Sequence, residues 1–110
     1  MPNYSANNIV LIRYPFTKSL ESKVRPAVVI STPHVSKDLF IIPLTSKTDS
    51  LLPGEFVLED WSSAGLNVAT AVKRGIFTVH EKLVIKKVGS LSEKDAEALK
   101  TSLKSWIEMS

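Results

Sequence analysis

Two short segments of this 110-residue chain combine an apolar run with groups that can bind an anion. In Arg25-Pro26-Ala27-Val28-Val29-Ile30-Ser31 a cation precedes the apolar residues. A guanidinium stays charged at any working pH and offers a planar fork of donors that suits phosphate. The second segment begins at Asp38 and ends in Thr45-Ser46-Lys47. The two segments predict a pair of strands that deliver polar groups from their ends.

Each of these residues also has a simpler interpretation. Arg25 could form a surface ion pair with Glu21, and Thr45 and Ser46 could bond to nearby backbone beside a turn. The other basic residues near strands are more often solvated than part of a phosphate track, and only their clustering in space would change that. These residues are Lys47, Lys73, Arg74, Lys82, Lys86 and Lys87.

The composition narrows the class of protein. With 44% hydrophobic and 23% charged residues the chain is typical of globular proteins, and its formal charge of +3 favours an anionic partner only weakly. The absence of cysteine excludes disulfides, thiolate catalysis and sulfur-based zinc sites. The N-terminus lacks the pattern of a secretory signal, and no apolar run approaches the roughly 20 residues that span a bilayer. We therefore expect a cytoplasmic protein without membrane association.

Several common chemistries lack their residues here. None of the four glycines has dinucleotide-binding or P-loop spacing, and no serine lies in a Gly-x-Ser-x-Gly elbow. His34 and His80 are the only histidines, and no HExxH motif or carboxylate cluster accompanies them. We expect no metal and no cofactor, and we expect His80 to be hydrogen-bonded or exposed rather than catalytic.

Hydrophobic patterning predicts one domain over residues 1–110, mainly β with a C-terminal helix, folded as a small and partly open barrel. A polar segment over 17–23 is expected to form an exposed, mobile loop, and 60–65 either a helical turn or a compact loop. The strands are expected at 9–14, 27–31, 39–44, 55–58, 69–74, 76–80 and 83–88.

The last segment reads as an amphipathic helix. Ser92-Glu93-Lys94-Asp95 has capping-box spacing, and Leu99, Leu103 and Ile107 follow at helical intervals, so we expect this stripe to pack on the sheet. Among the aromatic residues, Phe16 beside the polar loop is the candidate for stacking on a base. Buried packing is the expectation for the others, Phe77, Trp61 and Trp106.

From about Ile9 to Trp106 the chain resembles the PemK/MazF family of toxin-antitoxin ribonucleases. The segment that begins at Arg25 carries part of this resemblance, and the order of the matching phrases along the chain supports it. The other phrases are Ile42-Pro43-Leu44-Thr45-Ser46, Leu52-Pro53-Gly54-Glu55, Gly65-Leu66-Asn67 and Val88-Gly89-Ser90-Leu91-Ser92.

The resemblance implies an SH3-like barrel, a homodimer, a cognate antitoxin and metal-independent cleavage of single-stranded RNA, usually mRNA. The family's catalytic arginine and threonine correspond to Arg25 and Thr45. Cleavage would proceed by attack of the 2′-hydroxyl on phosphorus, giving 2′,3′-cyclic phosphate and 5′-hydroxyl ends. We expect further RNA contacts from Phe16, Lys23, Ser46, Lys47 and Arg74.

Two departures from the family pattern keep other functions open. Asn7-Asn8 stands where many relatives have Gly-Asp, and Lys73-Arg74-Gly75-Ile76-Phe77 replaces an Asp-Gln-x-Arg phrase. Because that phrase contributes to catalysis or RNA contact in some relatives, one alternative is a non-catalytic module that binds nucleic acid or an antitoxin. A second is a toxin with a protein target such as a topoisomerase.

Overall fold

The computed structural model describes residues 4–14 and 23–107, which form an antiparallel β fold with one α-helix. The elements in chain order are β1 (Asn8–Tyr14), β2 (Lys23–Val29), β3 (Asp38–Thr45), β4 (Phe56–Val57), β5 (Ala71–Val72), β6 (Phe77–His80), the 3-10 helix η1 (Glu81–Leu83), β7 (Val84–Ser90) and α1 (Glu93–Trp106).

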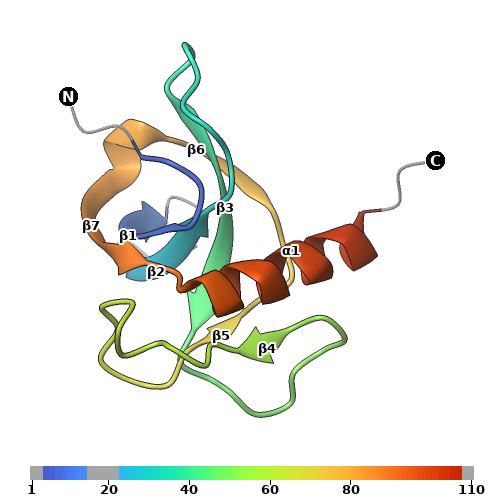
Figure 1. The fold of residues 1–110 in the computed structure, drawn as a ribbon. Coiled ribbons are helices and arrows are strands. Elements are labelled where there is room, and N and C mark those ends of the chain that lie inside the picture. The colour runs from blue at the N-terminus through green and yellow to red at the C-terminus, as the bar shows by residue number, and fades with distance from the viewer. Residues whose placement is uncertain (1–3, 15–22, 108–110) are drawn as a thin grey trace.

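The strands form one strongly curved sheet, and α1 lies across it (Figure 1). The strand order is β4-β5-β3-β2-β1-β7, and β6 pairs with β3 outside this path. β3 holds the sheet together because one of its edges pairs with β2 while the other pairs first with β6 and then with β5. This arrangement confirms the predicted fold class, mainly β with a C-terminal helix.

Every predicted strand is present, but several boundaries differ. β2 starts at Lys23 rather than at residue 27, so Arg25 lies inside the strand instead of before it. β4 and β5 contain only two residues each, fewer than the predictions over 55–58 and 69–74, because their pairing is confined to the short end of β3 and to each other. The turn of 3-10 helix at 81–83 was not predicted.

The core consists of two hydrophobic clusters on opposite sides of the central strands. Successive residues of a strand point to opposite faces, so Ile9 enters one cluster and Val10 enters the other. The same alternation places Ile42 under α1 and Ile41 on the other side of the sheet. Burial on both faces explains why these strands read as nearly continuous apolar runs.

The helix begins where the sequence predicts. Ser92 is its N-cap and accepts a hydrogen bond from the Asp95 N–H at 3.2 Å, while Leu99 is buried in the core. Leu103 is half-buried against the same cluster. The prediction for Ile107 was wrong, because Ile107 follows the last helical turn and is 43% exposed. Within the described residues, no helix is long and apolar enough to cross a membrane.

A buried carboxylate ties α1 to the chain that follows β4. Asp95 is 1% exposed, and its two carboxylate oxygens accept the backbone N–H groups of Glu59 and Asp60, each at 2.9 Å. An ion pair between Lys94 and Glu59 lies beside these bonds. Because a carboxylate can satisfy two N–H donors at once, Asp95 fixes where the segment after β4 leaves the sheet.

Replacing Asp95 with Ala should lower the free energy of unfolding by about 2–3 kcal/mol, because two backbone donors lose a charged acceptor in a buried site. Asp95→Asn keeps one acceptor oxygen and should cost less. Chemical denaturation measures both values, with exposed Glu97→Ala on the same helix as the control. Equal stability of Asp95→Ala and Glu97→Ala would contradict this role.

Candidate active site

A cleft opens where β2 and β3 separate. Their pairing runs from Val29↔Ile41 to Ala27↔Pro43 and then stops. Proline has no N–H to contribute to a ladder, and both Pro26 and Pro43 lie at this point. Beyond it β3 pairs with β5 instead, through Leu44 and Thr45.

The register of these strands brings Arg25 and Thr45 to the same place. Two residues beyond the Ala27↔Pro43 pair, the antiparallel register would set Arg25 opposite Thr45. Both residues line one cleft of about 370 Å³. Ser46 and Lys47 line the same cleft, so the structure brings together four of the predicted site residues.

The hydroxyl of Thr45 has a local structural bond as well as a place in the cleft. Its Oγ1 accepts the backbone N–H of Lys47 at 3.1 Å, which is the turn geometry considered as the simpler interpretation. A hydroxyl that accepts one hydrogen bond still carries its own hydrogen. Thr45 can therefore hold the turn at the end of β3 and donate to a ligand in the cleft.

The electrostatic character of the cleft is cationic. Arg25 is exposed, and the two ion pairs found in the described ranges, Lys37–Glu81 and Lys94–Glu59, do not involve it. The alternative pairing of Arg25 with Glu21 lies outside the described residues. None of the described residues that line the cleft is an aspartate, a glutamate or a histidine. A phosphate in this cleft would meet donors and cations without a competing carboxylate from the described lining.

The opposite wall of the cleft comes from the segment between β4 and β5. Its residues Leu66, Asn67, Val68 and Thr70 line the cleft, and the buried Thr70 donates its hydroxyl to the Val68 carbonyl at 2.8 Å. Sequence reasoning missed this wall. The only signal was the Gly65-Leu66-Asn67 phrase, to which no role could be given because its position over the sheet depends on long-range contacts.

Two glycines let this wall lie directly on β7. A Cβ on Gly89 would stand 2.0 Å from the Ala64 carbonyl oxygen, and one on Gly65 would stand 2.5 Å from the Val88 carbonyl oxygen. Gly65 also has a φ of +95°, which side chains other than glycine rarely adopt. The close approach of these two backbones fixes the position of the wall residues that follow.

Two further predicted RNA contacts, Lys23 and Arg74, do not belong to the lining of this cleft. Lys23 is exposed at the start of β2, and Phe16 lies outside the described residues, as do residues 17–22 of the expected loop. Arg74 is held elsewhere, because its backbone N–H donates to the Glu55 carboxylate at 2.8 Å. Neither Lys23 nor Arg74 lines the cleft.

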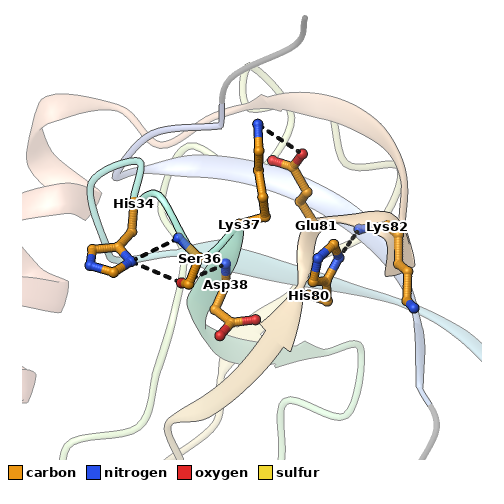
Figure 2. A network of polar contacts seen from close by, with 7 residues as sticks. All are labelled: His34, Ser36, Lys37, Asp38, His80, Glu81 and Lys82. Carbon is orange, nitrogen blue, oxygen red and sulfur yellow. Dashed lines mark hydrogen bonds and ion pairs between the residues drawn. The ribbon is translucent and has the colours of Figure 1, made fainter.

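The histidines have local roles at the other end of β3 (Figure 2). Nδ1 of His34 accepts the Ser36 N–H at 3.1 Å, and Nδ1 of His80 accepts the Lys82 N–H at 3.1 Å where η1 begins. This agrees with the expectation that His80 is hydrogen-bonded. The described residues contain no group of histidines and carboxylates that could hold a metal ion.

The aromatic residues divide between core and surface. Trp61 and Trp106 are half-buried against the cluster under α1, and Nε1 of Trp106 donates to the Pro53 carbonyl at 3.1 Å. The prediction that Phe77 is buried was wrong, since it is 39% exposed. Phe77 is the first residue of β6, which pairs only with β3 in the described sheet, so neighbouring strands do not enclose it.

The fold and the cleft together define a small β protein with a cationic site suited to phosphate. A model of the family described as PemK-like, MazF-like toxin of type II toxin-antitoxin system matches residues 6–107. The chain belongs to this family. No curated protein matches the chain.

Solved structures share the fold at low sequence identity. MazF from Deinococcus radiodurans is 18% identical, with a TM-score of 0.78 over 99% of this chain and 100% of the other. A chain of a MazE–MazF structure from the same organism is 17% identical, with a TM-score of 0.80 over 100% of both chains. An endoribonuclease from mycobacterial species, solved with its cognate antitoxin, is 14% identical, with a TM-score of 0.74 over 96% and 93%.

Glu55, which precedes β4, makes the stability of the fold depend on pH. The backbone N–H groups of Arg74 and Leu52, followed by the charges of Lys73 and Arg74, hold the pKa of the Glu55 carboxyl below its ordinary value of 4.5. A carboxyl whose pKa is lowered by folding stabilises the protein above its unfolded pKa. That contribution is lost as the pH falls through the folded pKa.

Glu55→Gln should therefore lower the melting temperature at pH 7, and the gap to wild type should narrow as the pH falls below 4.5. Thermal unfolding followed by circular dichroism from pH 7 to about pH 3 measures this. Exposed Glu93→Gln, outside this cluster, serves as the control. A gap that stays constant over the whole range would show that the charge of Glu55 does not contribute.

Proposed function

We propose that this chain is a metal-independent endoribonuclease toxin that cleaves single-stranded RNA in the cleft between β2 and β3. The observation that carries the proposal is that Arg25 and Thr45 line one cleft, just beyond the point where the β2–β3 pairing ends. Membership of the MazF-like toxin family supports it. Endoribonucleases from mycobacterial species share this fold, which agrees with the proposal.

RNA carries its own nucleophile, so the protein need only position the phosphate and stabilise charge. The 2′-oxygen attacks the adjacent phosphorus and loses its proton, and the bond from phosphorus to the 5′-oxygen breaks as that oxygen gains a proton. The products are a 2′,3′-cyclic phosphate and a 5′-hydroxyl. Extra negative charge develops on the nonbridging oxygens in the transition state, where fixed donors are most effective.

Arg25 and Thr45 fit the two parts of this task. The Arg25 guanidinium can face two phosphate oxygens at once and stabilise the charge that develops on them. The Thr45 hydroxyl donates to a nonbridging oxygen while its Oγ1 continues to accept the Lys47 N–H. Ser46 and Lys47 line the same cleft and hold the phosphate from the β3 side.

The described lining is assigned to positioning and charge stabilisation, not to removal of the 2′-proton. It contains no carboxylate and no imidazole, the side chains that most often act as general bases. The same observation favours the second candidate function, a module that binds RNA or an antitoxin without cleavage. The replacement of the late-strand acidic and basic phrase by residues 73–77 points in the same direction.

A cognate antitoxin and a second copy of the chain are the proposed protein partners. Relatives with the same fold have been solved with an antitoxin, one of them as MazE–MazF. An acidic antitoxin segment would compete with RNA for the cationic cleft. Light scattering of the purified protein with and without the antitoxin tests both assemblies.

The proposal is tested by incubating a long unstructured RNA with the purified protein in EDTA and mapping the new ends. Wild type should produce cyclic-phosphate and 5′-hydroxyl termini at a limited set of sites. Arg25→Ala should reduce the cleavage rate about 100-fold or more, the typical cost of losing a donor to developing oxyanion charge. Intact RNA binding without cleavage by wild type would favour the binding module instead.

Thr45 has a matched pair of substitutions. Thr45→Val keeps the shape and removes the hydroxyl, and it should slow cleavage by roughly 10- to 100-fold. Thr45→Ser restores the hydroxyl, together with the acceptor for the Lys47 N–H, and should recover most of the rate. Equal rates for the valine and serine variants would remove Thr45 from the mechanism. Circular dichroism of all variants checks that the fold is unchanged.

A further inference from the structure

A second cleft continues the first one toward β7. It measures about 380 Å³ and shares Pro26, Leu66 and Asn67 with the cleft that holds Arg25 and Thr45. Because three residues form part of both linings, the two clefts make one continuous groove. The residues that line only the second part are Leu11, Gly65, Lys86, Lys87 and Val88.

An irregularity in β7 places two adjacent lysines in this groove. Neighbouring residues of a regular strand point to opposite faces, so only one of Lys86 and Lys87 would be expected there. The pairing of β7 with β1 shifts register on both sides of these residues, and a bulge re-aims side chains. Lys87 lines the groove although Val10, its partner on β1, is buried in the core, and the register shifts account for this departure from strict alternation.

The groove is cationic at both ends. Lys86 and Lys87 are exposed at one end, while Arg25 and Lys47 lie at the other. No carboxylate belongs to either described lining, although the chain contains 11 acidic residues. Neither β7 lysine takes part in the ion pairs of the described ranges. Lysines that bind phosphate are expected to cluster in space, whereas ordinary surface lysines need not. Lys86 and Lys87 are clustered in this way at this end of the groove.

The middle of the groove is apolar. Leu11 and Pro26 line it from the strands and Leu66 from the opposite wall, with the Asn67 amide at the junction of the two parts. Such an apolar surface suits the face of a base or a ribose, and flanking lysines suit the phosphates that join them. The polar and apolar groups thus alternate as they do along an RNA strand.

We propose that Lys86 and Lys87 form a second subsite, which binds backbone phosphates of the RNA next to the scissile phosphate. This inference rests on the proposed function, since it assigns the neighbouring cleft to the scissile phosphate. The subsite adds affinity and holds the strand in line with Arg25 and Thr45. It does not act on the reacting atoms.

The test compares Lys86→Gln/Lys87→Gln with Lys100→Gln/Lys104→Gln, a pair that removes the same charge from the exposed side of α1. The probe is a fluorescent, fully 2′-O-methylated RNA of mixed sequence, which binds but has no 2′-hydroxyl to attack. The β7 pair should weaken binding about 10-fold at low salt and reduce the slope of log K against log[salt] by about 1.4, or about 0.7 for each lost phosphate contact. The α1 pair should leave both quantities near wild type.

Cleavage of unmodified RNA provides a second readout. The β7 pair should lower kcat/KM with little change in kcat at saturating RNA, since a subsite away from the reacting atoms contributes to binding. If wild type binds RNA without cleaving it, the proposed ribonuclease function is contradicted, and the affinities of the β7 and α1 pairs then decide whether the subsite exists. Cleavage that is unaffected by the β7 pair would defeat the subsite alone.

Three further results would overturn the inference. Equal losses for the β7 and α1 pairs would show that only net charge matters. Failure of wild type to bind the methylated RNA at any salt would show that the groove does not hold this strand. Normal RNA binding by the β7 pair, combined with weakened binding of an acidic antitoxin peptide, would assign the lysines to the antitoxin.

Discussion

The end of the β2–β3 ladder is the constraint on which the site depends. Hydrogen bonding fixes Ala27 opposite Pro43, and the absence of an N–H on two nearby prolines coincides with the point where the strands separate. The cleft exists because the strands diverge there, and the register determines which side chains face each other across it. A shift of one residue would point Arg25 or Thr45 to the other face of its strand.

The rest of the molecule holds this opening in shape. Asp95 anchors the start of the β4–β5 segment to α1, and the close approach of Gly65 to β7 holds its middle. Together these contacts fix the positions of Leu66 and Asn67, which form the far wall of the groove. The helix therefore helps to position the site, although none of its side chains lines the groove.

Local signals in the sequence were sufficient for the presence of the strands and of α1, but not for η1 or for several strand boundaries. Apolar runs located the strands, Ser92 located the start of the helix, and the two strand segments pointed to Arg25 and Thr45, which line one cleft. The far wall and the paired lysines could not be predicted, because they depend on backbone contacts between residues distant in sequence and on register shifts in the pairing of β7 with β1. The errors at Ile107 and Phe77 have a similar origin. Ile107 is exposed because the helix ends before it, and Phe77 is exposed because its strand, β6, pairs with only one neighbour in the described sheet.

Family membership and low identity are compatible in this fold. Structures with 14–18% identity superpose over most of the chain, which requires the same alternation of buried positions rather than the same residues. The proposed chemistry depends on a few side chains near the point where the β2–β3 pairing ends. In this chain those side chains are cations and hydroxyls, which suits a reaction whose nucleophile belongs to the substrate.

The central claim is that Arg25 and Thr45 act together on a single phosphate, and a double-mutant cycle tests it most directly. Single-turnover cleavage of one RNA is measured for wild type, Arg25→Ala, Thr45→Val and the double variant. If both side chains stabilise the same transition state, the double variant should lose clearly less than the product of the two single losses. Losses that multiply, or single variants that cleave as fast as wild type, would contradict the account.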